Sequence, residues 1–78
     1  MNIQKGTLIK TKKEIEIPIM PPVLFGHLKE NTTYKVSEMK NNDEVTLHEV
    51  TEEAFQNVSI KISQIEDETN QGHIQILN

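Results

Sequence analysis

Three histidines, His27, His48 and His73, are the side chains best suited to acid–base or metal chemistry near neutral pH. Two histidines and a carboxylate can hold a zinc ion when their spacing brings them together. Each histidine here lies in a different segment, and no His-x-His, His-x-x-x-His or His-Glu-x-x-His pattern occurs. We therefore expect surface or turn positions for the histidines, with no metal site and no cofactor.

Paired carboxylates are the second candidate for catalysis. Glu14 and Glu16 have the chemistry of a general acid and base, but they alternate with Ile15 and Ile17. That alternation is typical of a strand with one solvated face. The serines lack the context of a nucleophile elbow, and isolated glycines form no phosphate-binding loop. The sequence therefore predicts a protein that is not an enzyme.

Lysines supply all eight basic residues, and Lys10, Lys12 and Lys13 form one cluster that could contact phosphates. Against this, the net charge is −4 and the chain has no arginine, the preferred partner of phosphates and guanine edges. Nucleic-acid binding is thus disfavoured, and mimicry of nucleic acid by the dispersed acids is a minor alternative. A chain without arginine and rich in Ile, Lys and Asn is typical of AT-rich genomes.

Residues 20–28 combine prolines with apolar side chains in the least regular part of the sequence. Pro21 and Pro22 enforce an extended entry. Leu24 and Leu28 are spaced for one helical turn, whereas Gly26 argues against a longer helix. Two interpretations stay open: the segment plugs one end of the core, or it is an exposed apolar patch that marks a partner site.

The elements that would position these side chains are short strands. The clearest signal is a hairpin in residues 32–50, which reverses through a polar turn at residues 40–43. Out-of-phase Met39 and Val50 mark bulges or strand ends, and Pro18 places its strand at a sheet edge or ends it. Residues 51–55 resemble a capped helical turn, residues 58–63 alternate as a strand, and residues 66–72 resemble a polar loop. The expected inward side chains are Leu8, Ile15, Ile17, Ile19, Leu24, Tyr34, Val36, Val45, Leu47, Phe55, Val58, Ile60, Ile62, Ile74 and Ile76.

These patterns predict an all-β single domain over residues 1–78. Five or six short strands with one helical turn favour a small SH3-like barrel or a barrel-like meander. A chain of 78 residues buries a small core, and it has no cysteine to supply disulfides. No apolar run is long enough to span a membrane. We expect a soluble, cytoplasmic protein.

The polar turn, Tyr34-x-Val36, a second turn and Val45-x-Leu47, within residues 29–47, resemble small SH3-like barrel proteins of bacteria and phages. That resemblance implies a docking module. A second segment, Ile15-x-Ile17-Pro18 followed by a helical turn through Leu28 and by Tyr34-x-Val36, is similar to swapped-hairpin DNA-binding domains of the AbrB and antitoxin kind. Those domains form interlaced dimers and use basic residues on DNA.

The resulting hypothesis is a non-catalytic protein-binding module, an accessory or inhibitor protein of a phage or mobile element. The alternative is a nucleic-acid-associated barrel or swapped-hairpin regulator using Lys10, Lys12, Lys13 and Lys35. The expected partner is another protein, and a homodimer through an edge strand is a further possibility. The candidate binding residues, including outward positions of the central hairpin, are Pro21, Pro22, Phe25, His27, Lys35, Thr46 and His48.

Overall fold

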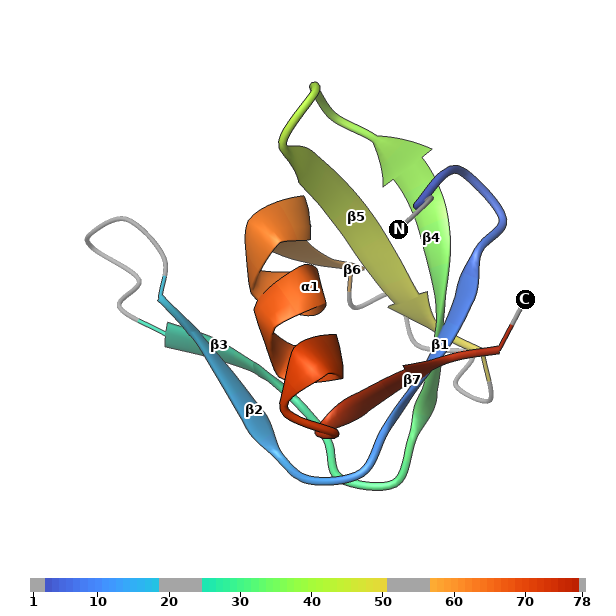
Figure 1. Ribbon diagram of the computed structural model, residues 1–78. Coiled ribbons are helices and arrows are strands. Elements are labelled where there is room, and N and C mark those ends of the chain that lie inside the picture. Colours follow the sequence, from blue (N-terminus) through green and yellow to red (C-terminus); the bar gives the residue numbers. More distant parts are fainter. Residues whose placement is uncertain (1–2, 19–24, 51–56, 78) are drawn as a thin grey trace.

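The computed structural model describes residues 3–18, 25–50 and 57–77, with the side chains of Phe25 and Asn57 left out. The described chain is mostly β-structure with one short helix, which confirms the prediction of an all-β, barrel-like fold (Figure 1). The elements in chain order are β1 (Leu8–Thr11), β2 (Ile15–Pro18), β3 (Phe25–Leu28), β4 (Thr33–Met39), β5 (Glu44–Glu49), β6 (Asn57–Lys61), α1 (Ile62–Asn70) and β7 (Ile74–Ile76).

Five strands form one antiparallel sheet in the order β6-β5-β4-β1-β7, and β2 and β3 pair with each other in a separate two-stranded sheet. The five-stranded sheet curls into a half-barrel (Figure 1). Helix α1 contacts both edge strands, β6 and β7, and so covers the open side of the half-barrel. The β2–β3 hairpin, which we call the arm, extends from the sheet beside α1.

The core lies between the curled sheet, α1 and the arm. Ile9, and not Leu8 as expected, points inward, because Ile9 is the register partner of the buried Tyr34. Ile19, Leu24 and Phe55, also expected inside, lie outside the described residues, as does the expected helical turn at residues 51–55. The buried apolar residues are Ile3, Ile9, Ile15, Ile17, Leu28, Tyr34, Val36, Val45, Leu47, Ile60, Ile65 and Ile74, with Val58, Ile62 and Ile76 packed against them.

The central hairpin is formed by β4 and β5. Its turn is held by the Asn41 side chain, whose Oδ1 accepts hydrogen bonds from the main-chain N–H groups of Asp43 and Glu44 at 2.8 and 2.9 Å. Met39 is the last residue of β4 and Val50 follows β5, so both mark strand ends as expected. The register shift of this hairpin lies earlier, between Val36 and Glu38.

Helix α1 corrects the expectation of a strand through residue 63 and a polar loop over residues 66–72. Ile62 and Ile65 are three residues apart, so both lie on the face of the helix that packs on the core. Ile65, which breaks the strand alternation, is completely buried. The helix has no side-chain cap at Lys61 and no acid in its first turn, so its start carries no local signal.

The end of α1 is a Schellman motif. The Gly72 N–H donates to the Thr69 carbonyl at 3.0 Å and the His73 N–H donates to the Glu68 carbonyl at 2.8 Å. Gly72 adopts a φ of 81°, which a glycine accepts without strain. This turn leads directly from the helix into β7.

The arm corrects the expectation of a loop with a helical turn at residues 20–28, since Phe25–Leu28 form strand β3. Leu28 is completely buried opposite Ile15. Pro18 is the last residue of β2, and β2 pairs only with β3, so its predicted edge position is confirmed. The consecutive prolines of the segment lie outside the described residues.

Candidate binding groove at the edge of strand β6

The described residues among those predicted to bind a partner lie on two separate parts of the fold, the arm and the central hairpin. His27 is exposed on the arm, opposite Glu16. Lys35 and His48 are register partners on β4 and β5, where Lys35 is exposed and His48 half-buried. Pro21, Pro22 and the Phe25 side chain lie outside the described part of the chain.

Thr46 points away from the core as expected, but only 8% of its surface is exposed, so its side chain is not accessible to a partner. Thr46 is the register partner of Ser59 on β6. The Lys40 Nζ donates a hydrogen bond to the Ser59 hydroxyl at 3.1 Å. The Lys40 side chain therefore crosses β5 on the sheet face that carries Thr46, and this accounts for the burial.

A hollow of about 400 Å³ lies between the arm and strand β6. The floor of the hollow is formed by two core residues, Ile17 from β2 and Ile60 from β6. Their side chains are almost fully buried, with 2% and 1% of their surface exposed. The remaining lining residues, which form the rim, are Pro18, Glu44, Ser59, Lys61 and Gln64. We call this hollow and the adjoining edge of β6 the β6 groove.

The main chain of β6 presents hydrogen-bonding groups toward this groove. In an antiparallel pair, residues alternate between those that bond the partner strand and those whose N–H and C=O both point away from it. The Ile62 N–H donates to the Asp43 carbonyl at 2.6 Å, which sets the phase of the β5–β6 ladder. In that phase Ile60 bonds β5, and the N–H and C=O of Ser59 point away. Outside the strand ladders, none of the main-chain hydrogen bonds among the described residues involves Ser59.

Positive charge lies next to this free edge. Lys61 is exposed at the end of β6, and the Lys40 ammonium reaches the Ser59 hydroxyl. Glu44, the β5 partner of Lys61, also lines the groove and contributes one negative charge, whereas Glu38 lies on β4 opposite Thr46. Among the described residues, an added strand along β6 would therefore meet two lysines and one glutamate.

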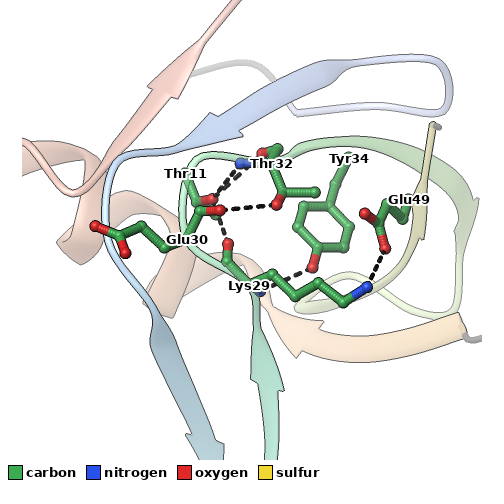
Figure 2. Close-up of polar contacts among 6 residues, drawn as sticks. All are labelled: Thr11, Lys29, Glu30, Thr32, Tyr34 and Glu49. Atoms are coloured by element: carbon green, nitrogen blue, oxygen red, sulfur yellow. Dashed lines mark hydrogen bonds and ion pairs between the residues drawn. The ribbon is translucent and has the colours of Figure 1, made fainter. Parts of the chain in front are cut away.

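The arm is joined to the sheet by a polar cluster at its base (Figure 2). The Thr11 hydroxyl donates to the Lys29 carbonyl at 2.5 Å and accepts from the Thr32 N–H at 3.0 Å. The Lys29 N–H donates to the Tyr34 hydroxyl at 2.9 Å, and the Lys29 ammonium pairs with the Glu49 carboxylate at 3.1 Å. The end of β1, the end of the arm and the start of β4 are thereby held together.

Burial raises the pKa of the Tyr34 hydroxyl, and the nearby Glu49 charge acts in the same direction. The hydrogen bond from the Lys29 main chain and the Lys29 charge oppose this shift without cancelling it. Tyr34 is therefore a structural group that stays neutral, and the cluster is a junction between elements.

A second tie holds the arm against the helix. The Gln64 side-chain amide of α1 donates to the Glu16 carbonyl of β2 at 2.9 Å. Since Gln64 also lines the β6 groove, one side chain connects the helix, the arm and the groove.

Lys10 and Lys12 line another, open hollow of about 460 Å³ with Glu30, Asn31 and Gln75. Glu30 contributes an acidic group beside the two lysines, which lowers the positive potential available to a phosphate. Elsewhere, His73 and Glu68 form a pair at 2.8 Å next to the end of α1. Within the described residues no three His, Asp or Glu side chains come together as metal ligands.

No family model, curated protein or solved structure matches the chain. The helix that the structure describes is neither long nor apolar enough to cross a membrane.

The groove residues Ser59, Lys61 and Gln64 were missed by the sequence interpretation. Ser59 and Lys61 lie in a segment with a correct strand pattern, but nothing local indicates which strand forms a sheet edge, and Gln64 lies in the helix that was not expected. Pro18 was the one groove residue with a readable signal, because a proline is confined to edges and strand ends.

Proposed function

We propose that the protein is a non-catalytic module that binds another protein by accepting an extended segment of that partner along the edge of β6. Strand addition of this kind uses main-chain hydrogen bonds for affinity and side-chain pockets for specificity. The observation that carries the proposal is the main chain of Ser59, which points away from β5 and has no partner among the described residues, above an apolar floor formed by Ile17 and Ile60.

The arrangement of the sheet supports the predicted likeness to SH3-like docking barrels. In the five-stranded sheet, β4, β5 and β6 are consecutive neighbours, and β1 lies between β4 and β7. The sheet is curled, so that its two edges approach each other (Figure 1). A cysteine-free chain is compatible with a reducing compartment, and we propose that the protein works in the cytoplasm. Its composition favours a phage or mobile-element accessory or inhibitor protein.

The test begins with selection of peptides from a displayed library on the purified full-length protein. The amide signals of the selected complex are then followed by NMR. We expect the signals of Ser59 and Lys61 to shift most, because their main chain faces the groove. Shifts confined to the hollow around Lys10 and Lys12 would contradict the proposal.

Two substitutions at one position separate the main chain from the side chain. Ser59→Ala and Ser59→Pro both remove the hydroxyl, but only Ser59→Pro removes the N–H that faces the groove. We expect Ser59→Ala to retain peptide binding and Ser59→Pro to lose it, with folding checked by circular dichroism. Equal binding by both folded variants would rule out strand addition at Ser59, and the NMR shifts decide if Ser59→Pro does not fold.

The second candidate function is nucleic-acid binding, favoured by Lys10 and Lys12 in one hollow. Binding through phosphates must weaken steeply as salt concentration rises. A titration of duplex and single-stranded DNA and RNA at low and high salt tests it, and no binding at low salt would remove this candidate.

A further inference from the structure

The direction of the β6 side chains restricts what an added strand can carry. Val58 and Ile60 belong to or pack against the core, whereas Ser59 and Lys61 lie on the opposite face of the strand. Side chains of an added strand alternate between the same two faces. A partner residue beside Ile60 therefore points into the hollow over Ile17 and Ile60, and its neighbours point to the face that carries Ser59.

The hollow suits an apolar side chain. Its floor is formed by two isoleucines that are almost fully buried by the rest of the protein. An apolar residue placed there removes more apolar surface from water, whereas a charged one would lose hydration without a partner at the floor.

The opposite face suits acidic side chains. Among the described residues, the Lys40 ammonium lies 3.1 Å from the Ser59 hydroxyl, and the exposed Lys61 is two positions farther along β6. Glu44, the β5 partner of Lys61, contributes one negative charge to the groove, so the two lysines outnumber it. Complementary charge at an exposed rim adds modest affinity and selects between partners.

We infer that the segment recognised by the β6 groove is an extended peptide in which acidic residues alternate with at least one branched apolar residue. The apolar residue occupies the hollow over Ile17 and Ile60, and the acidic residues on either side meet Lys40 and Lys61. This inference rests on the proposed strand addition at β6 and adds the chemistry of the partner to it.

The experiment uses two fluorescently labelled peptides on the full-length protein, followed by anisotropy at low salt. One has the core Glu-Ile-Glu-Val-Glu and the other Lys-Ile-Lys-Val-Lys, so only the charge differs. We expect tighter binding of the acidic peptide. Equal or tighter binding of the basic peptide, or no binding of the acidic peptide, would overturn the inference.

A matched pair of variants assigns the charge to the groove. Lys61→Glu is expected to weaken the acidic peptide roughly fivefold, the upper range for exposed ion pairs. Lys5→Glu makes the same change in net charge at an exposed position before β1, which is three strands from β6 in the sheet, and is expected to leave the affinity unchanged. Equal effects of both variants would mean that only the overall charge acts, and would overturn the assignment.

The outcomes separate this inference from the proposed function. If Ser59→Pro abolishes binding of library-selected peptides while Lys61→Glu has no effect, strand addition stands and the acidic preference fails. If Ser59→Pro binds as well as Ser59→Ala, the proposed function fails. A dimer in light scattering that Ser59→Pro dissociates, and that the acidic peptide does not displace, would assign the edge to a second copy and overturn the inference.

Discussion

The molecule contains two β-hairpins that are held in different ways. The β4–β5 hairpin has strands of seven and six residues, and it lies inside the five-stranded sheet with β1 and β6 on its two sides. The β2–β3 arm has two strands of four residues that pair only with each other (Figure 1). Neighbouring strands pair with the β4–β5 hairpin on both sides, whereas the arm is attached to the rest of the molecule through side chains.

This difference concerns the β6 groove, because the groove lies between the sheet and the arm. The sheet wall is continuous with the hydrogen-bonded ladder of β5 and β6. The arm wall is held by buried side chains such as Ile15 and Leu28, by the Thr11 cluster at its base and by the Gln64 bond. We therefore expect the arm to open at a lower free energy than the central hairpin.

The largest expected effect is in the central hairpin. Leu47→Ala removes a fully buried side chain from β5, and we expect a loss of about 2–5 kcal/mol in the free energy of unfolding. Urea denaturation followed by circular dichroism measures it. A loss below about 1 kcal/mol would mean that the sheet is not the stable part of the molecule.

The next effect is at the base of the arm. Thr11→Val removes the hydroxyl that bonds Lys29 and Thr32 and leaves their main-chain groups without this partner, at a cost of about 1–3 kcal/mol. We expect hydrogen exchange to accelerate more in the arm than in β4–β5. Thr11→Ser keeps the hydroxyl and serves as the control. Uniform acceleration in both hairpins would contradict the comparison.

A smaller effect is expected at the tie between α1 and the arm. Gln64→Ala removes the bond to the Glu16 carbonyl, which water can replace, so the free energy of unfolding should fall by about 0.5–1.5 kcal/mol or less. Hydrogen exchange should still rise locally in the arm. An arm that exchanges as slowly as in the parent protein would show that Gln64 does not hold it.

The smallest expected effect is the contribution of Tyr34 ionisation to the free energy of unfolding, which changes only at alkaline pH. Because burial raises the pKa of Tyr34 above its ordinary value of 10.0, the unfolded protein loses this proton first. The stabilising contribution is therefore complete below about pH 10 and is lost as pH rises from there through the folded pKa. Urea titrations across this range should show a shallower alkaline decline for Tyr34→Phe than for the parent. Parallel declines would contradict the assignment.

Local patterns were sufficient for most strands of this fold. The alternation around Tyr34 and Val36 and the strand-ending Pro18 predicted elements that the structure confirms. The segment after Ile60 was misread because Ile62 continues the strand alternation while the helix lacks an N-terminal cap. Gly72 offered a helix-end signal, but its Schellman motif can be recognised only once the preceding residues are known to be helical.

The groove was harder to predict from the sequence than the fold. The Ser59 main chain points away from the described sheet because β6 is the last strand in its order, and strand order is a property of the whole chain. Thr46 was expected to be accessible because alternation cannot show that Lys40 crosses to Ser59 over its face. The binding residues therefore could not be predicted from local sequence patterns, because they are defined by contacts between segments far apart in the chain.

The burial of Tyr34 has a practical consequence for studying the protein. The chain contains one tyrosine and no tryptophan, so its intrinsic fluorescence is dominated by Tyr34. That ring lies where β1, the arm and β4 meet (Figure 2). Emission and the absorbance of the ionised phenol thus form a built-in optical signal for this junction. Any movement of the arm on addition of a peptide can be followed in the unlabelled protein.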